Sequence, residues 1–319
     1  MGSGRLLAAR DEAGSLSGTE TPLVSVVVPC LNRAHLIVPT LQSILGQDYP
    51  RIECIVADGG STDGTIEILE RYGDAVRWFS EPDEGHADAI NKGWLRSRGQ
   101  ILAWLNADDM WVEPDAVSQA VGYLGEHPDV DLVYGECEAV DMEGRLIARS
   151  YHHEWDLEHA VVHCDYCIPQ PTSFIRRRVL ERVGWLDNAF VSKKDHELWL
   201  RVGLAGTIRY IPALLARERI GPGYLAHRGD ITARACVALT RKFFTLEGVP
   251  PGLRAQRRRA LSNSYLEGMK WAYECGRHWS TILGFSLWAA VVDPSNAARS
   301  LANLKFYLRS GLRSRDQGP

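Results

Sequence analysis

Hydrophobic and polar positions alternate in regular blocks along the first 110 residues of the chain. Short β-branched runs predict strands at residues 24–28, 52–57, 76–79 and 101–105, and Pro29 ends the first of them. Apolar residues at helical spacing predict helices at residues 36–45, 65–72 and 86–98. Strands that alternate with helices are typical of an α/β fold, in which a mostly parallel sheet carries helices on both faces.

The second half of the chain is less regular. Residues 130–134 and 209–219 predict further strands, residues 179–187 a short helix with a turn, and residues 196–203 a helix. From Ile231 onward the pattern is mainly helical. We therefore expect a flexible lead-in at residues 1–21, an α/β domain at residues 22–225 and a helical region at residues 226–319.

Polar residues gather where the predicted strands end. They are Asn32 and Arg33, Asp58, Asp83, and the pair Asp108 and Asp109. In open α/β sheets ligands bind beyond the carboxyl ends of the strands. The sequence therefore predicts a binding site along this edge of the sheet.

The segment Asn106-Ala107-Asp108-Asp109 follows the predicted strand at residues 101–105. Adjacent carboxylates repel each other, and a divalent cation such as Mg²⁺ or Mn²⁺ compensates that repulsion while it also binds diphosphate oxygens. The alternative is a solvated turn, because pairs of aspartates are common. The position directly after a buried strand favours the metal site.

Three other polar residues fit a nucleotide ligand. Asp58 and Asp83 follow strands, so their carboxylates can accept hydrogen bonds from a nucleobase or a ribose, although an aspartate there can also cap the next helix. Lys92 can place its charge on a phosphate, and the alternative is an ordinary surface lysine.

The charge of the chain is unevenly distributed. The formal net charge is −4, but the residues from Pro251 onward contain eleven Lys and Arg against four Asp and Glu. No basic stripe runs through the acidic body, which argues against a nucleic-acid substrate. Seven cysteines without framework spacing favour a reducing, cytoplasmic setting.

Several segments, in this order, resemble glycosyltransferase family 2, whose members have the Rossmann-like GT-A fold. The segments are residues 24–33, 57–65, 81–85, 88–93, 104–109 and 195–201. The resemblance covers over half of the chain and implies an inverting enzyme. Such an enzyme moves a sugar from a nucleoside-diphosphate donor to a hydroxyl of a glycan or a lipid-linked acceptor, in cell-surface polysaccharide or glycolipid biosynthesis.

The resemblance also implies roles for individual residues. Asp195 would be the catalytic base and Gln170 would face the acceptor, while Asp108 would bind the Mn²⁺ or Mg²⁺ ion together with Asp109. The residues that would bind the nucleotide-sugar are Pro29, Asn32, Arg33, Asp58, Asp83, Lys92, Asn106 and Asp108.

Three departures from the family pattern qualify these roles. Asn106 replaces a more frequent aspartate, which removes one charge from the metal site. Lys194 stands where an acidic residue usually precedes the base, and its charge would favour the ionised form of Asp195 and lower its basicity. Gly221 stands where the family often has a histidine, so His227 is an alternative metal ligand.

Two other functions are alternatives at this stage. A nucleotidyltransferase would have a similar sheet and paired acids, but residues 29–33 lack the glycines of a phosphate loop. The other alternative function is a non-catalytic scaffold that binds sugar nucleotides, but the retained acidic residues argue against it. His159, His163, Cys164 and Cys167 have spacings that suit zinc, but we favour unligated side chains because no second Cys-x-x-Cys pair follows.

The C-terminal region has two interpretations. Basic residues at 257–259 and interleaved aromatic residues suit an amphipathic helix in peripheral contact with the inner face of a membrane. The aromatic residues are Trp271, Trp279, Trp288, Phe306 and Tyr307. The other interpretation, which we favour at this stage, is a pair of helices packed on the catalytic domain. The apolar run at residues 282–292 is too short to cross a bilayer.

Overall fold

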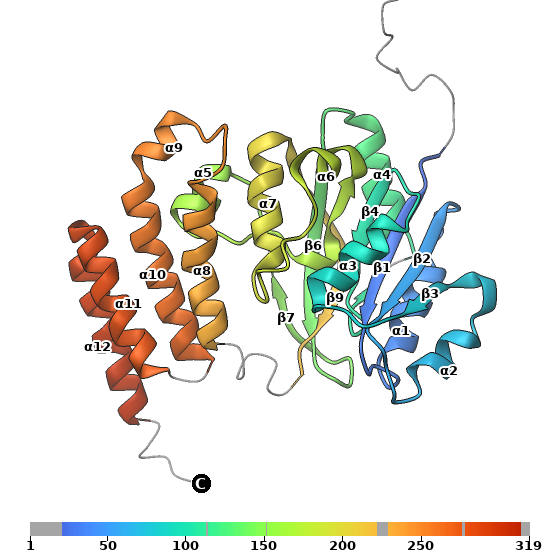
Figure 1. Cartoon of the computed structure of the whole chain (residues 1–319), viewed down its shortest axis with the longest axis horizontal. Coiled ribbons are helices and arrows are strands. Elements are labelled where there is room, and N and C mark those ends of the chain that lie inside the picture. Colours follow the sequence, from blue (N-terminus) through green and yellow to red (C-terminus); the bar gives the residue numbers. More distant parts are fainter. Residues whose placement is uncertain (1–20, 113, 151, 222–228, 276–277, 314–319) are drawn as a thin grey trace, which may run out of the picture.

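The computed structural model describes residues 21–112, 114–150, 152–221, 229–275 and 278–313. Within them, one nine-stranded sheet has the order β3-β2-β1-β4-β8-β6-β9-β5, and β7 pairs with β6 (Figure 1). The strands are β1 (Val24–Cys30), β2 (Ile52–Asp58), β3 (Arg77–Ser80), β4 (Ile101–Trp104), β5 (Met110–Trp111), β6 (Leu132–Val140), β7 (Leu146–Ser150), β8 (Phe174–Arg176) and β9 (Ile208–Arg219).

The sheet is parallel in its first half and mixed in its second. Strands β1, β2, β3 and β4 pair in parallel, as the alternating pattern predicts. Strand β8 then runs antiparallel to both β4 and β6, β7 forms an antiparallel pair with β6, and β5 runs antiparallel to β9. The fold class is confirmed, but the sheet is less parallel than expected. Strands β5, β7 and β8 were not predicted from the sequence. Strand β5 has only two residues and β8 only three.

The helices are α1 (Ile37–Leu45), α2 (Thr65–Glu70), α3 (His86–Leu95), α4 (Ala116–Glu126), α5 (Leu157–Val162), α6 (Arg177–Val183), α7 (Lys194–Ala205), α8 (Gly229–Phe243), α9 (Pro251–Ala255), α10 (Arg257–Glu274), α11 (Trp279–Val292) and α12 (Ala297–Arg313). Helices α1, α2 and α4 cover one face of the sheet, and α3, α6 and α7 cover the other. Successive side chains of a strand point to opposite faces. Val26 and Val28 accordingly join the core under α1 and α4, and Val27 joins the core under α3, α6 and α7.

The position of Pro29 in β1 differs from the sequence-based expectation. Pro29 does not stop the strand; it lies inside it, buried, in register with Ala57 of β2. The strand continues to Cys30, whose carbonyl accepts a hydrogen bond from the backbone N–H of Gly59. The first and second strands therefore remain joined up to the edge where the polar loops begin.

The helical region packs beside the sheet rather than apart from it. Helix α8 contacts α7, α10 contacts both α8 and α5, and α11 and α12 follow in turn (Figure 1). Apolar residues of α5, α7, α8, α9 and α10 share one core. The expected boundary between residues 225 and 226 lies outside the described residues, and so does the lead-in up to residue 20.

Candidate active site

The loops after β1 and β2 are fixed to each other by Asn32. Its side-chain oxygen accepts a hydrogen bond of 2.9 Å from the N–H of Thr62, and its own N–H donates to the Ser61 hydroxyl at 2.7 Å. Asn32 has a φ of 54°, a left-handed conformation that asparagine tolerates better than most residues. The exposed side chain of Arg33 leaves the same loop toward solvent.

Asp58 ends β2 and is only 1% exposed. Its carboxylate accepts hydrogen bonds from the N–H groups of Gly60 and Ser61, both at 2.9 Å, and from the Ser80 hydroxyl at 2.6 Å. The residue therefore shapes the loop after β2 and ties it to β3. The sequence analysis assigned Asp58 to the nucleotide and did not foresee this local role.

Asp83 approaches the same loop from the end of β3. A Cβ atom on Gly59 would lie 2.5 Å from an Asp83 carboxylate oxygen, so a larger residue at position 59 would require the Asp83 side chain to move. The Gly85 N–H donates to the other oxygen of Asp83 at 2.8 Å. The two acids that were predicted for the nucleoside are thus held on adjacent strand ends.

Lys92 of α3 holds the neighbouring loop. Its ammonium group lies 2.9 Å from the Asp88 carboxylate and 3.7 Å from that of Glu81, and it donates to the Pro82 carbonyl at 2.8 Å. These interactions place Lys92 among protein acceptors, with 27% of its side chain exposed.

Asn106 is the centre of a polar network after β4. Its amide nitrogen donates to the Asp109 carboxylate at 2.8 Å and to the Gln170 side-chain oxygen at 3.2 Å, and its oxygen contacts the His86 ring nitrogen at 2.9 Å. Gln170 in turn donates to the Trp104 carbonyl at 2.8 Å. An aspartate at position 106 has no N–H to donate, which explains the asparagine in physical terms.

Asp109 lies beneath this network and is 1% exposed. One carboxylate oxygen accepts from Asn106 and the other accepts from the Arg219 N–H at 3.1 Å. Burial, followed by the charges of Asp108 and Glu218, raises the pKa of Asp109 well above its ordinary value. Both oxygens of Asp109 thus accept hydrogen bonds from protein donors, whereas Asp108 is only half-buried.

A cavity of about 510 Å³ opens at this edge of the sheet. Its walls bring Asn106 and Gln170 together with Asp195 and Glu218. Trp271 of α10 closes another part of the wall, so the helical region contributes to the site. Glu218 of β9 and Trp271 of α10 were not predicted as site residues, because contacts between segments that are distant in the chain leave no periodic signal in the sequence.

Asp195 lies in the first turn of α7, where a helix favours negative charge. The His196 ring nitrogen lies 2.9 Å from its carboxylate. Burial alone would raise the pKa of Asp195, but His196, Lys194 and Lys193 outweigh it and hold that pKa well below its usual range. Burial lowers the pKa of His196.

Lys193 precedes α7 with a φ of 62° and contacts two aromatic rings, of which that of Trp271 belongs to the pocket wall. Its ammonium group lies 3.9 Å from the Tyr166 ring centroid and 4.7 Å from that of Trp271. Such cation–π contacts stabilise a charge that is partly removed from water. Lys193, which lies two residues before the predicted base, is therefore anchored to the helical region.

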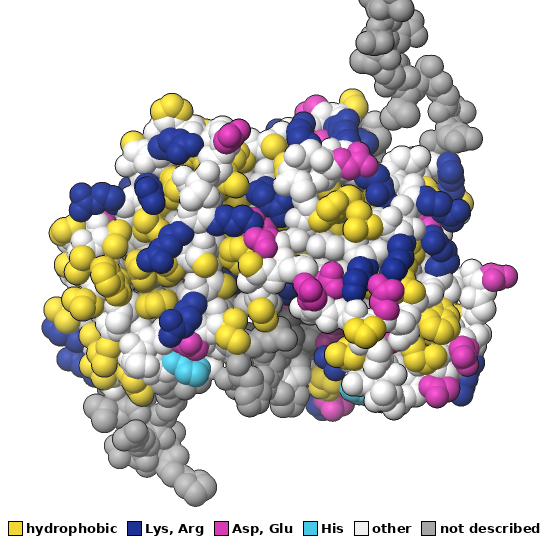
Figure 2. Space-filling model, viewed as in Figure 1, with side chains coloured by type: hydrophobic (Ala, Val, Ile, Leu, Met, Phe, Trp, Pro, Cys, Tyr) yellow, Lys and Arg dark blue, Asp and Glu magenta, His cyan; other side chains and the backbone are white. Residues whose placement is uncertain are grey.

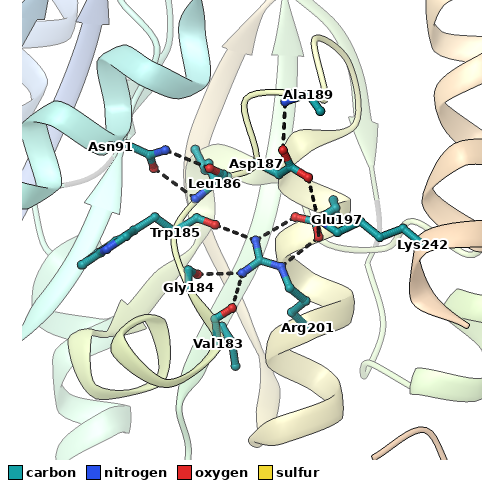
Figure 3. Close-up of polar contacts among 10 residues, drawn as sticks. All are labelled: Asn91, Val183, Gly184, Trp185, Leu186, Asp187, Ala189, Glu197, Arg201 and Lys242. Carbon is teal, nitrogen blue, oxygen red and sulfur yellow. Dashed lines mark hydrogen bonds and ion pairs between the residues drawn. The ribbon is translucent and has the colours of Figure 1, made fainter. Parts of the chain in front are cut away.

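The rest of the motif at residues 195–201 is structural. Arg201 forms a bidentate pair with the buried Glu197, at 2.8 and 2.7 Å, and donates to the carbonyls of Val183, Gly184 and Trp185 (Figure 3). Lys242 of α8 lies 2.7 Å from Glu197 and 2.6 Å from Asp187. This network joins α7, the loop after α6 and the helical region.

The zinc candidates are dispersed in the structure. The rings of His159 and His163 contact each other at 5.0 Å, and Cys164 is a buried thiol. Among the described residues, Cys167 instead lies with His153 and Asp165, whose ligand atoms are within 4.8 Å of one another. Burial raises the pKa of Cys167 to about 11, which disfavours the thiolate that zinc requires. His227 lies outside the described residues.

Comparisons with known proteins agree with this geometry. The model of Glycosyl transferase family 2 matches residues 25–184. A PGL/p-HBAD biosynthesis glycosyltransferase of Mycobacterium bovis is 31% identical over 171 residues, which are 51% of this chain and 62% of that protein. A protein of Rickettsia bellii named an uncharacterized glycosyltransferase is 28% identical over 216 residues, which are 62% of this chain but 30% of that protein. The chain thus matches less than two thirds of the length of either relative.

Two solved structures share the fold. The mannosyltransferase PcManGT from Pyrobaculum calidifontis, in complex with GDP-Man and Mn²⁺, has a TM-score of 0.58 and 23% identity, covering 86% of this chain and 87% of that one. TarS of S. aureus in complex with UDP-GlcNAc has a TM-score of 0.60 and 18% identity, covering 88% and 80%. The fold agrees with the GT-A expectation, and because the family model covers half of its length, the chain belongs to glycosyl transferase family 2.

Proposed function

We propose that this chain transfers a sugar, with inversion, from a nucleoside-diphosphate sugar to a hydroxyl of a glycan or a lipid-linked acceptor. The observation that carries the proposal is the shared cavity, in which the Asp195 carboxylate faces the same space as Asn106 and Gln170. A base on one wall and a donor-binding edge on the other are what a direct displacement between two substrates requires.

The donor side of the site is the edge formed by the loops after β1, β2, β3 and β4. In this proposal the nucleoside lies beside Asp58 and Asp83, and the diphosphate lies toward Asn106 and Asp108. Pro29, Asn32, Arg33 and Lys92 complete this side, with Asn32 and Lys92 acting through the loops that they hold in place. The bound GDP-Man and UDP-GlcNAc of PcManGT and TarS support the donor class.

A divalent cation fits the acids beside this edge. Asp108 and Glu218 lie close enough to Asp109 to raise its pKa, so negative charge is concentrated there. Carboxylate oxygens are the ligands that Mg²⁺ and Mn²⁺ prefer, and one or two of them suffice when the substrate adds phosphate oxygens. Asp108, with Glu218 nearby, would hold the ion, which when bound neutralises charge on the leaving diphosphate.

Asp195 is the proposed base. The acceptor oxygen forms a bond to the anomeric carbon while the bond from that carbon to the diphosphate oxygen breaks, and the acceptor proton passes to Asp195. One displacement from the face opposite the leaving group inverts the configuration. The low pKa of Asp195 keeps it ionised but also lowers its basicity, and the His196 ring nitrogen, 2.9 Å from the carboxylate, holds its orientation.

The acceptor side is proposed to include Gln170 and Trp271, with residues 22–225 as the catalytic domain and residues 226–319 as a region that completes its pocket. The name of the Mycobacterium bovis relative supports a glycolipid or surface-glycan pathway. All seven cysteines are free and buried, which supports a reducing cytoplasmic setting.

Calorimetric titration tests the donor site. UDP, GDP and dTDP are each titrated with Mn²⁺ and with EDTA into the wild type, Asp108→Ala and the control Asp74→Ala, whose side chain is exposed away from the site. We expect metal-dependent binding of one nucleotide, lost in Asp108→Ala and kept in the control. Binding of none of the three under either condition would contradict the proposal. Asp195→Asn then separates a transferase from a scaffold, because only a transferase loses turnover while it keeps nucleotide binding.

A further inference from the structure

Helix α11 is apolar around its whole circumference but is buried on one side only. Ile282 and Ala289 have no exposed surface and pack against α10 and neighbouring helices. Leu283, Leu287 and Val291, spaced four residues apart, are 52%, 64% and 55% exposed. A surface helix of a globular protein normally has a polar outer stripe, so this one leaves a large apolar face without a partner in the described chain.

Trp288 of α11 and three residues of α12 enlarge that face. Trp288 is 52% exposed, and Leu301, Phe306 and Leu308 of α11's neighbour α12 are 50%, 63% and 43% exposed. Half of the fourteen exposed large hydrophobic side chains in the described chain lie on these two helices. Figure 2 shows the apolar side chains gathered at the α11–α12 end of the molecule, with Lys and Arg side chains among them.

The charges on α11 and α12 are mostly basic, whereas Glu267 and Glu274 of α10 lie near Tyr307 of α12. Residues 279–313 include four basic residues and the single acid Asp293. Lys305 and Arg309 are exposed on α12. The basic run at residues 257–259 adds to them, because the Arg258 side chain donates to the Val292 carbonyl at 3.0 Å and so lies at the end of α11. An apolar face with a basic border matches the headgroups and acyl boundary of an anionic bilayer.

We propose that the exposed face of α11 and α12, named here the α11–α12 face, docks onto the surface of an anionic lipid membrane. A second copy of the chain is the main alternative occupant, but a two-fold contact would place Lys305 and Arg309 near their own copies, which repel. No described helix is long and apolar enough to pass through a bilayer, so the helices lie along its surface. The proposal does not rest on the transferase function.

Vesicle flotation of the full chain tests this docking. The vesicles are phosphatidylcholine alone or phosphatidylcholine with 30% phosphatidylglycerol, taken as roughly the anionic content of a charged leaflet. We expect flotation with the anionic vesicles, a decrease at high salt because screening weakens the attraction, and little flotation with the neutral ones. Equal flotation with both kinds, or none with either, would overturn the proposal.

Matched variants locate the contact. Leu287→Ser with Trp288→Ser should lower the partition coefficient at least roughly tenfold, because two large apolar side chains no longer enter the lipid. The control Leu146→Ser with Ile147→Ser removes side chains of similar exposure, 52% and 55%, on β7 and should leave flotation unchanged. Lys305→Glu with Arg309→Glu should remove the preference for anionic vesicles.

Two further measurements keep the result interpretable. Circular dichroism melting of each variant shows whether it folds, and the exposed positions chosen should leave the melting temperature nearly unchanged. Sedimentation velocity gives the oligomeric state. A dimer that Leu287→Ser with Trp288→Ser dissociates, in a protein that floats with neither vesicle, would assign the α11–α12 face to a second copy and overturn the proposal. Nucleotide titration is independent of all these outcomes.

Discussion

The side-chain amide of Asn106 donates a 2.8 Å hydrogen bond to the carboxylate of Asp109, which is 1% exposed. An asparagine can donate this bond and also hold Gln170, and it adds no charge beside a buried acid. The asparagine at position 106, where the family more often has an aspartate, therefore has a local physical reason. Asp109 is buried, and Asn106 stabilises its carboxylate by donating a hydrogen bond.

Asn106→Asp should destabilise the protein. The substitution removes the donor to Asp109 and Gln170 and places a second carboxylate beside a buried one. We expect a loss of about 1–3 kcal/mol in the free energy of unfolding at neutral pH, measured by urea denaturation. The loss should shrink below pH 4, where the new carboxyl is protonated. A variant as stable as the wild type at pH 7 would show that the network contributes little.

Arg201→Met should be more damaging. It leaves Glu197 buried, with Lys242 as its remaining cation, and frees the carbonyls of Val183, Gly184 and Trp185. The expected loss is about 3 kcal/mol in the free energy of unfolding. Arg201→Lys should recover only a small part of it, because an ammonium group cannot form the bidentate pair. Full recovery with lysine would mean that charge alone, without the planar fork, fixes the loop.

Asp195→Asn should abolish transfer while nucleotide binding persists. We expect a fall in kcat of about 10²–10⁴, measured with the donor that calorimetry identifies. Because the pKa of Asp195 is held below its ordinary value, wild-type activity should show no loss from this group between pH 8 and about pH 5. An acid limb near pH 6 or 7 would point to a different titrating group.

The same pKa shift has a consequence for stability. A carboxylate whose folded-state pKa is depressed contributes stability above its unfolded pKa of about 3.9, and that contribution is lost as the pH falls through the folded value. The difference in unfolding free energy between the wild type and Asp195→Asn should therefore be constant from pH 6 to 8 and narrow only below about pH 4. A difference that changes across the neutral range would contradict the low pKa.

Gly93→Ala tests how closely α3 packs on the sheet. A Cβ atom at Gly93 would lie 2.5 Å from a Val27 methyl carbon on the central strand β1. Overpacking of this kind costs about 1–3 kcal/mol. Val27→Ala in the same chain should recover part of the loss, since it removes the clashing methyl groups, and the double-mutant cycle measures that coupling.

Gly122→Ala in α4 is the matched control. A Cβ atom there meets nothing within 4 Å, so the higher helix propensity of alanine should stabilise the protein by up to about 1 kcal/mol. If both glycine substitutions change the free energy of unfolding equally, the close approach of α3 to β1 is not the reason why position 93 requires glycine.

The sequence by itself determined the first half of the sheet and the edge where the site lies. Period-two and helical patterns are local properties, and parallel strands bring their carboxyl ends to one edge, so Asp58 and Asp83 could be placed together from the order of elements alone. The motif at residues 195–201 was also evident, and its resemblance to the family gave Asp195 as the expected base, but the structural pair of Glu197 and Arg201 was not foreseen.

Only the tertiary structure decided which polar atoms are free to bind a ligand and what closes the pocket. Asn106 meets Gln170 across 64 residues of chain, and Lys193 reaches the Trp271 ring from another helix. The short strands β5 and β8 likewise pair with strands that are distant in sequence. Burial, hydrogen-bond partners and the unpartnered apolar face of α11 all arise from contacts between segments that are far apart in the chain, and no local pattern encodes them.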